Sequence, residues 1–298
     1  MAESTLSTYT ALDGDNLAIQ DWPLDFTQAL RGVVLIVHGL GEHAGRYDAL
    51  ARRLNTWGFA VRGYDQYGHG ESEGVRGGLP RNTRLLDDLA DVLDSTRSRM
   101  NKTAPLILLG HSLGGLLAAR LVALKGEGVV QGLVLSSPAF DPGLSAFQKT
   151  LLAVMLRLAP DWCLGNGLIP RLISHDPAVV AAYRADPLIH HRISARLAHF
   201  IVETAAATLA QAPQWQVPTL LLYAGADRIV NPTGSRAFAA AAPAHLVQAH
   251  CFDGLYHEIF NDLDSAPVFR QLQQWLDASF STTATPHPSA PRGAASPG

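Results

Sequence analysis

The sequence predicts an α/β sandwich in which a mostly parallel sheet lies between two layers of helices. Short runs that are apolar throughout are typical of strands buried on both faces of a parallel sheet. Along the chain they alternate with segments whose apolar residues recur every three to four positions, the period of a helix. With 298 residues, of which 47% are hydrophobic and 16% charged, the chain can bury a sizeable core and is not of the disordered or fibrous class.

The elements follow in a regular order. Asp13–Asn16 is a turn signal between two extended segments and predicts an N-terminal hairpin. Apolar runs predict strands at 33–37, 105–109, 133–135 and 219–223, with weaker candidates at 59–62 and 246–252. Helical periodicity predicts helices near 47–54, 85–93 and 116–124, the first of them with Gly58 as its stop signal.

One long segment breaks this alternation. Between Pro138 and Pro218 we find helical patterns and no convincing strand, which indicates helices inserted as a cap over the sheet. We therefore expect a core in two parts, residues 1–138 and 216–280, with a cap at 139–215. The tail 281–298 is rich in proline and has no large apolar residue, so we expect it to be disordered.

The first helical pattern of the cap has an unusually apolar face. It consists of Leu144, Phe147, Leu151, Val154, Met155 and Leu158. Two interpretations stay open: the face packs down on the core, or it lines a binding tunnel and touches micelles or membranes.

A candidate nucleophile lies in the pattern Gly-x-Ser-x-Gly at Gly110–Gly114, which follows a predicted strand and opens a predicted helix. This strand–turn–helix setting exposes a serine on a tight turn that needs small neighbours, and it places Ser112 at a helix N-terminus. The same pattern recurs at Gly70–Gly74, in a polar loop where glutamates flank Ser72. Negative neighbours disfavour an oxyanion, so we predict Ser112 as the nucleophile.

A serine nucleophile needs a histidine base and a carboxylate that orients it. Asp227 follows the strand at 219–223 and His257 follows the one at 246–252, so both should reach the edge of the sheet where Ser112 lies. The N–H groups of Leu113 and of Leu40, in a glycine-rich loop after the first parallel strand, are the expected donors to an oxyanion. That loop lacks the phosphate-binding glycine patterns.

At this point the sequence resembles the monoacylglycerol lipase family of α/β-hydrolases, which is sometimes grouped with lysophospholipases and a serine aminopeptidase clan. The resemblance covers nearly the whole chain except the tail. It is carried by His38–Tyr47, Tyr64–Gly74, Gly110–Gly115, Asp176–Ser194, Gly225–Val230 and Tyr256–Asp262. His175 departs from the family, whose members often carry arginine before the aspartate of this cap segment.

The resemblance implies an α/β-hydrolase fold and a serine carboxylesterase without cofactor or metal. Its substrates would be monoesters of glycerol or lysophospholipids. The apolar face of the cap independently favours a lipid-like substrate, and from it we predict Leu144, Phe147, Leu151 and Met155 as the residues that bind the acyl chain. The alternatives are a lysophospholipase or general carboxylesterase, then an aminopeptidase or amidase, for which the cap is poor in acids. A non-catalytic binding protein of this fold would usually lack a member of the triad.

Net charge, targeting signals and cysteine content indicate which partners, location and disulfide bonds to expect. The net charge is −3 without a basic stripe, which argues against a nucleic-acid partner. The first twenty residues lack a signal-peptide pattern, and His111, Ser112 and glycines interrupt the most apolar window, so we expect a cytoplasmic protein, peripheral to membranes at most. Cys163 and Cys251 are too few for a disulfide framework and are expected to be reduced. The oligomeric state is left open.

Overall fold

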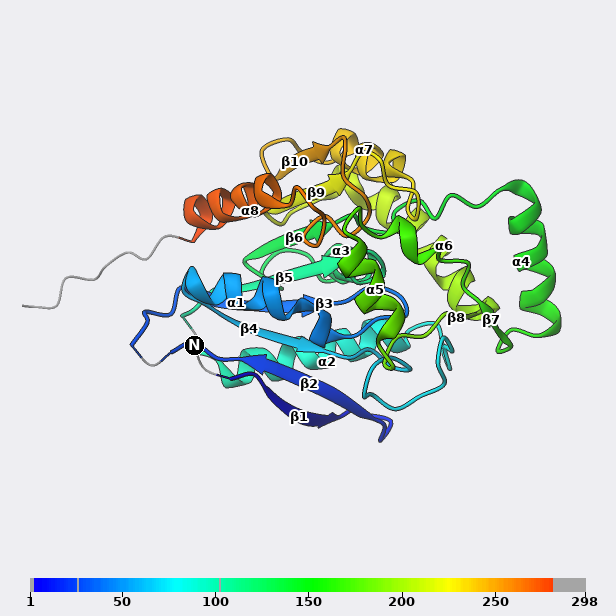
Figure 1. Ribbon diagram of the computed structural model, residues 1–298, viewed down its shortest axis with the longest axis horizontal. Helices are drawn as coiled ribbons and strands as arrows, with labels where there is room; N and C mark the ends of the chain where they lie inside the picture. Colours follow the sequence, from blue (N-terminus) through cyan, green and yellow to red (C-terminus); the bar gives the residue numbers. More distant parts are fainter. Residues whose placement is uncertain (1–2, 26, 102, 281–298) are drawn as a thin grey trace, which may run out of the picture.

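The computed structural model describes residues 3–25, 27–101 and 103–280. Within these residues the main sheet has eight strands in the order β1-β2-β4-β3-β5-β6-β9-β10 (Figure 1). The predicted hairpin pairs antiparallel with β4, and the remaining strands of this sheet are parallel. The strands are β1 Thr5–Thr10, β2 Asn16–Trp22, β3 Gly32–Val37, β4 Phe59–Tyr64, β5 Leu106–His111, β6 Gly132–Ser136, β9 Thr219–Ala224 and β10 Val247–Phe252.

Helices cover both faces of this sheet, as predicted for a three-layer sandwich. The α-helices are α1 Asp48–Thr56, α2 Arg84–Arg99, α3 Leu113–Lys125, α4 Ala146–Leu158, α5 Pro177–Ala185, α6 Ala195–Gln211, α7 Pro232–Ala241 and α8 Ala266–Ser279. Short 3₁₀ turns lie at Ala44–Tyr47, Pro170–Leu172 and Ala212–Gln214. The weaker strand candidates of the sequence are thus real strands, and the fold is that of an α/β-hydrolase.

Two separate apolar cores explain why the strands are apolar throughout. Successive residues of β3 point to opposite faces, so that Leu35 packs with α2, α3 and α6 while Ile36 packs with α1 and α8. Because both faces are covered by helices, no position of the strand tolerates a polar residue. This double burial produces the continuous apolar runs from which the strands were predicted.

The segment predicted as a cap contains two strands that the sequence analysis missed. Cys163–Gly165 (β7) and Arg192–Ser194 (β8) form a small antiparallel sheet. Each has three residues, too few to show an alternating pattern, so the expectation of an all-helical insertion was wrong. Helix α6 packs along α3 of the core, whereas α4 lies beyond α6 at the outer end of the molecule (Figure 1).

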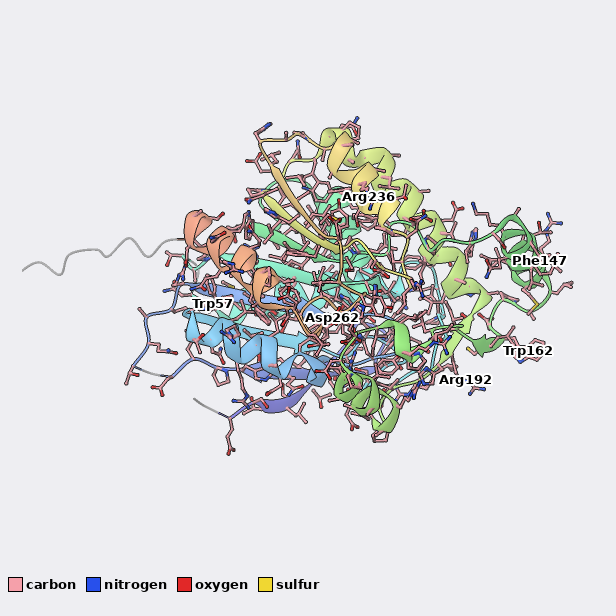
Figure 2. The ribbon with its side chains drawn as sticks, turned by 45° about the horizontal axis from the view of Figure 1, so that its top comes forward. Trp57, Phe147, Trp162, Arg192, Arg236 and Asp262 are labelled. Carbon is pink, nitrogen blue, oxygen red and sulfur yellow. The ribbon has the colours of Figure 1, made fainter. Side chains whose placement is uncertain are left out.

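Helix α4 has no buried residue, which rules out the interpretation that its apolar face packs down on the core. Phe147 is 76% exposed, and Leu151 and Val154 are about half exposed. Figure 2 shows Phe147, and Trp162 just after the helix, at the outer end of the cap. Large apolar side chains are therefore presented to the surroundings where a soluble protein usually covers them.

The remaining expectations concern the two cysteines, membrane-spanning helices and the C-terminal tail. Cys163 and Cys251 are both free and half-buried, in β7 and β10. No helix in the described part of the chain is long and apolar enough to cross a bilayer. The predicted disorder of the tail 281–298 lies outside the described residues.

Candidate active site

Ser112 lies on a strained turn between β5 and α3. Its φ of 52° falls in the left-handed region, which costs a non-glycine residue of the order of 1–3 kcal/mol. The flanking glycines make the turn possible: a Cβ on Gly110 would come within 2.3 Å of the Gly114 carbonyl oxygen, and one on Gly114 within 2.1 Å of the Val37 carbonyl oxygen. The serine is thereby held at the N-terminus of α3, at the carboxyl edge of the parallel strands.

His257 and Asp227 meet at the same edge, on the loops that follow β10 and β9. The imidazole Nδ1 lies 2.7 Å from Asp227 Oδ2, and their side chains are only 6% and 3% exposed. The imidazole lies against the turn, with its ring centroid 4.7 Å from that of His111, and it lines the same cavity as Ser112. The structure thus brings together the three side chains that the sequence predicted to act together.

The surroundings of His257 favour its protonated form. Burial alone would lower the pKa of this imidazole, but the charge and hydrogen bond of Asp227, with Glu258 and Glu42 nearby, raise it above the ordinary value. Burial raises the pKa of Asp227 in turn, yet His257 and the N–H groups of Ile229 and Val230 outweigh it and keep the carboxylate ionised. An ionised Asp227 can stabilise the imidazolium that forms when His257 accepts a proton.

The two predicted oxyanion donors, the N–H groups of Leu40 and Leu113, lie on segments next to Ser112. A Cβ built on Gly39 would lie 3.2 Å from the Ser112 Cβ, so the loop after β3 touches the serine directly. Leu40, on this loop, and Leu113, at the start of α3, both line the cavity. Among the described residues, neither N–H has a hydrogen-bond acceptor. Free donors at this place are what an oxyanion would require.

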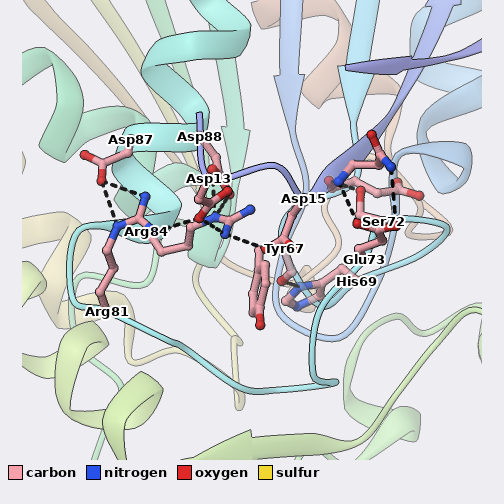
Figure 3. Close-up of polar contacts among 12 residues, drawn as sticks. Asp13, Asp15, Tyr67, His69, Ser72, Glu73, Arg81, Arg84, Asp87 and Asp88 are labelled. Carbon is pink, nitrogen blue, oxygen red and sulfur yellow. Dashed lines mark hydrogen bonds and ion pairs between the residues drawn. The ribbon is translucent and has the colours of Figure 1, made fainter. Parts of the chain in front are cut away.

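The hydroxyl of Ser72, the alternative nucleophile, is used in hydrogen bonds within the protein. It donates to the Asp65 carbonyl at 2.6 Å and accepts from the Ala18 N–H at 2.8 Å. No helix opens at this loop, since α2 begins only at Arg84. Figure 3 shows the loop beside the hairpin: Glu73 of the loop accepts hydrogen bonds from Asn16, while Arg84, at the start of α2, binds Asp13 and Asp15 of the hairpin turn. The proton and one lone pair of the Ser72 hydroxyl thus serve the packing of the loop.

The cavity beside Ser112 has two chemically different ends. It encloses about 920 Å³, counting its open mouth. At one end Arg46 forms ion pairs with both Glu42 and Glu258, and its guanidinium lies 4.9 Å from the centre of the Tyr183 ring. The opposite wall is apolar. Its residues are Leu144, Leu168, Ile193, Ile201 and Val202.

Of the four predicted acyl-binding residues, only Leu144 lines this cavity. Phe147, Leu151 and Met155 lie on α4 and are not among the residues that line it, so their contact with an acyl chain stays a prediction. Ile201 and Val202 of α6 line the cavity as well. Their positions could not be recognised in the sequence, because a helix that packs on α3 with one side and lines the cavity with another has no distinctive pattern. Glu42 and Arg46 were visible in the motif His38–Tyr47 but were given no role.

No metal centre is evident in the described residues: none of their histidines, cysteines and carboxylates gather in groups of three or more that could hold an ion.

Comparison with known proteins agrees with this geometry. The sequence profile of the family described as "Serine aminopeptidase, S33" matches residues 28–264, and the chain belongs to this family. It is 32% identical over 281 residues to a monoacylglycerol lipase of Mycolicibacterium smegmatis, covering 93% of this chain and 99% of that one. A monoglyceride lipase of Homo sapiens is 31% identical over 283 residues, with coverages of 93% and 91%.

Solved structures extend the comparison to the fold. The crystal structure of the Paleococcus ferrophilus monoacylglycerol lipase superposes with a TM-score of 0.78 at 34% identity, covering 88% of this chain and 99% of that one. The fold and the family together place the protein among the serine carboxylic-ester hydrolases of the α/β-hydrolase fold.

We expect the substitution Ser112→Ala to lower kcat by about 10⁶ with an unchanged melting temperature, because triad members act as a unit. Ser72→Ala should retain kcat but lower the free energy of unfolding by about 1–3 kcal/mol, since the Ala18 N–H loses its acceptor. Assays with a soluble butyrate ester and thermal unfolding of both variants measure this. If the two serines exchanged these outcomes, the choice of nucleophile would be wrong.

The pH dependence of kcat/KM should report on His257. Only the neutral imidazole can accept a proton, so kcat/KM should fall as the pH drops through the pKa of His257, with a midpoint above the ordinary histidine value of about 6.5. Burial and the nearby His257 lower the pKa of His111 to about 3, which keeps that residue out of this range. Asp227→Asn should move the midpoint to lower pH and reduce kcat roughly 10⁴-fold. An unchanged midpoint in that variant would point to another carboxylate.

Proposed function

We propose that the protein hydrolyses monoacylglycerol-like esters through an acyl-enzyme on Ser112. The observation that carries this proposal is the cavity at Ser112, which joins a charged, hydrogen-bonding end to a long apolar wall. A monoester of glycerol has the same division, with free hydroxyls on one side of the ester bond and a hydrocarbon chain on the other. Relatives at about 30% identity over more than nine-tenths of this chain are named for that substrate.

The proposed mechanism assigns one task to each group. Ser112 attacks the ester carbonyl while His257 accepts its proton, and the Leu40 and Leu113 N–H groups bind the oxyanion, each contributing about 3 kcal/mol to the transition state. His257 then protonates the glycerol oxygen, which leaves. Water, deprotonated by His257, releases the fatty acid. Asp227 orients the imidazole and stabilises its charged form.

The charged end of the cavity favours a neutral polar group over an amine. The Glu42 carboxylate accepts hydrogen bonds from Arg46, Tyr47 and the Gly39 N–H. Both oxygens of Glu258 bind Arg46. An aminopeptidase would need a carboxylate that pairs with the substrate ammonium, and the two acids of the cavity wall are already committed. Hydroxyl groups could still hydrogen-bond at the edge of this network.

The acyl chain would continue beyond the first cavity. A second, more open pocket of about 720 Å³, counting its open mouth, adjoins the apolar wall and shares Pro142, Leu144 and Val202 with the first cavity. Its further walls come largely from α6 and α7, with Ala205 and Leu209 among them. The route of a long chain would thus run along α6, with Val202 between the two cavities, and not along the face of α4.

The exposed face of α4 suits a different task. A long-chain monoester resides in micelles or membranes and must leave them to reach Ser112. We propose that Phe147, Leu151 and Met155 contact such aggregates transiently from a protein that is otherwise cytoplasmic. Burial of the exposed Phe147 and Leu151 side chains in lipid would contribute on the order of 2 kcal/mol each.

The proposed substrate class is tested by rates on a monoacylglycerol, a lysophospholipid and an aminoacyl anilide of matched chain length. The monoacylglycerol should give the highest kcat/KM. A faster reaction with the anilide would identify an amidase, and labelling by a fluorophosphonate without turnover of any ester would contradict the proposal.

Val202→Trp should shorten the preferred acyl chain, because the indole would fill the passage between the two cavities. We expect butyrate hydrolysis to stay within a few-fold of the unsubstituted protein and palmitate hydrolysis to fall by more than tenfold. Monodisperse nitrophenyl esters measure this without an aggregate surface. Leu124→Trp, at a half-exposed position of α3 outside both cavities, is the control. Equal losses on both esters would exclude the proposed route.

Leu151→Glu should impair hydrolysis of aggregated long-chain monoacylglycerol and leave the soluble butyrate ester and the melting temperature unchanged, since no residue of α4 is buried. Leu12→Glu makes the same change at a leucine that is 90% exposed on the hairpin turn and should affect neither substrate. A collapsed melting temperature with equal losses on both esters would contradict the contact of α4 with lipid.

A further inference from the structure

The loop that carries His257 lies between β10 and α8 and contains no helix or strand. Two hydrogen bonds hold it on either side of the histidine. The Tyr256 N–H donates to Asp262 Oδ2 at 2.8 Å, and the Glu258 N–H donates to the carbonyl of Ile173 in the cap at 2.8 Å. The position of His257 therefore depends on a carboxylate and on a cap segment that are not part of the triad.

Asp262 is the centre of this arrangement, and Figure 2 shows it in the interior of the molecule. Its side chain is fully buried. It accepts hydrogen bonds from the main-chain N–H groups of Tyr256, Leu263 and His175. Burial alone would raise the pKa of Asp262, but these bonds and the His175 side chain lower it below the ordinary value. A buried, ionised carboxylate thus connects the histidine loop to the cap.

His175 contacts both parts of this loop with its side chain. Its Nδ1 lies 3.0 Å from Asp262 Oδ2, and its ring stacks on Tyr256 with the centroids 3.5 Å apart and the planes at 25°. Yet the side chain is 38% exposed, so it does not fill the core. The imidazole is placed between solvent, the buried carboxylate and the residue that precedes His257 in the chain.

We propose that His175 is a positioning residue for the ester-cleaving reaction: through Asp262 and Tyr256 it fixes the loop that places His257 against Asp227. The neighbouring residue Ile173 supports this role, because it lines the cavity while its carbonyl binds the loop on the other side of His257. A shift of this cap segment would therefore change the position of His257 relative to Asp227. A displacement of about 1 Å in a reacting group can cost 10²-fold in rate.

A merely structural contact would have different consequences. Other ion pairs of the cap, such as Arg196 with Asp161, contact no part of the histidine loop. If His175 only fastened the cap, its loss would lower the melting temperature and leave the chemistry of the folded protein unchanged. A positioning role predicts a loss in kcat and in the reactivity of Ser112, together with a shift in the pH profile.

The experiment compares His175→Leu, which removes the donor to Asp262, with His175→Asn, whose amide can still donate from nearly the same place. Arg196→Leu is the control for loss of a cap ion pair. Readouts are kcat and KM for a soluble butyrate ester, the rate of labelling by a fluorophosphonate, the pH profile of kcat/KM and the melting temperature. Tyr256→Leu, which removes the stacked ring and keeps the N–H, provides a second test should His175→Leu not fold.

We expect His175→Leu to lower kcat and the labelling rate together by about tenfold or more with little change in KM. The acid limb of kcat/KM should move to lower pH, because a looser contact with Asp227 lowers the pKa of His257. His175→Asn should recover most of the rate, Arg196→Leu should resemble the unsubstituted protein, and Tyr256→Leu should lose rate in the same direction as His175→Leu.

Unchanged kcat and labelling in folded His175→Leu or Tyr256→Leu would overturn the proposal, whatever the melting temperature. The inference rests on the proposed ester chemistry but not on the monoacylglycerol substrate. If the unsubstituted protein neither cleaved the butyrate ester nor reacted with the fluorophosphonate, the proposed function would fail. If it did both and the variants did not differ from it, only the role of His175 would fail.

Discussion

The close contact between the turn at Ser112 and the carboxyl end of β3 is the constraint on which the rest of the site depends. Gly114 presses against the carbonyls of Val37 and His38, and Gly39 presses against Ser112 itself. This close approach accompanies the strained φ of Ser112 and brings the loop after β3, with Leu40, next to the serine. The elbow and the candidate oxyanion donors are therefore one structural unit, which neither strand could form alone.

Parallel strands explain how the other two members of the candidate triad reach this unit. β9 and β10 end at the same edge of the sheet as β5, so Asp227 and His257 arrive there although they are more than a hundred residues from Ser112 in sequence. This convergence could be predicted from the sequence, because it requires only the order of the strands and the residues that follow them. The strands themselves could be predicted because both faces of the sheet are covered, which leaves runs of apolar residues.

The parts that could not be predicted depend on packing between distant segments. Strands β7 and β8 are too short to have a pattern, and each exists only because the other lies beside it. Part of the apolar wall of the cavity comes from α6, whose residues pack on α3 as well, so sequence periodicity alone assigned this helix no special role. Conversely, the apolar face of α4 suggested a tunnel wall, yet no residue of α4 lines the cavity. The sequence shows that a helix has an apolar face, but it does not show which other elements lie opposite that face.

The loop with His257 also depends on packing between segments that are distant in sequence. Its sequence identifies the histidine, but its conformation is set by partners in the cap and by the buried Asp262, which ends the motif Tyr256–Asp262 and was given no role from the sequence. Irregular loops have no repeating backbone hydrogen bonds, so each of their N–H groups needs an individual acceptor. Asp262 accepts from two of them, at Tyr256 and Leu263, and from the His175 N–H of the cap, while a cap carbonyl accepts from a third loop N–H, that of Glu258. A loop held in this way is only as well placed as its partners, so the cap belongs to the machinery that orients His257 as well as to the wall that encloses the substrate.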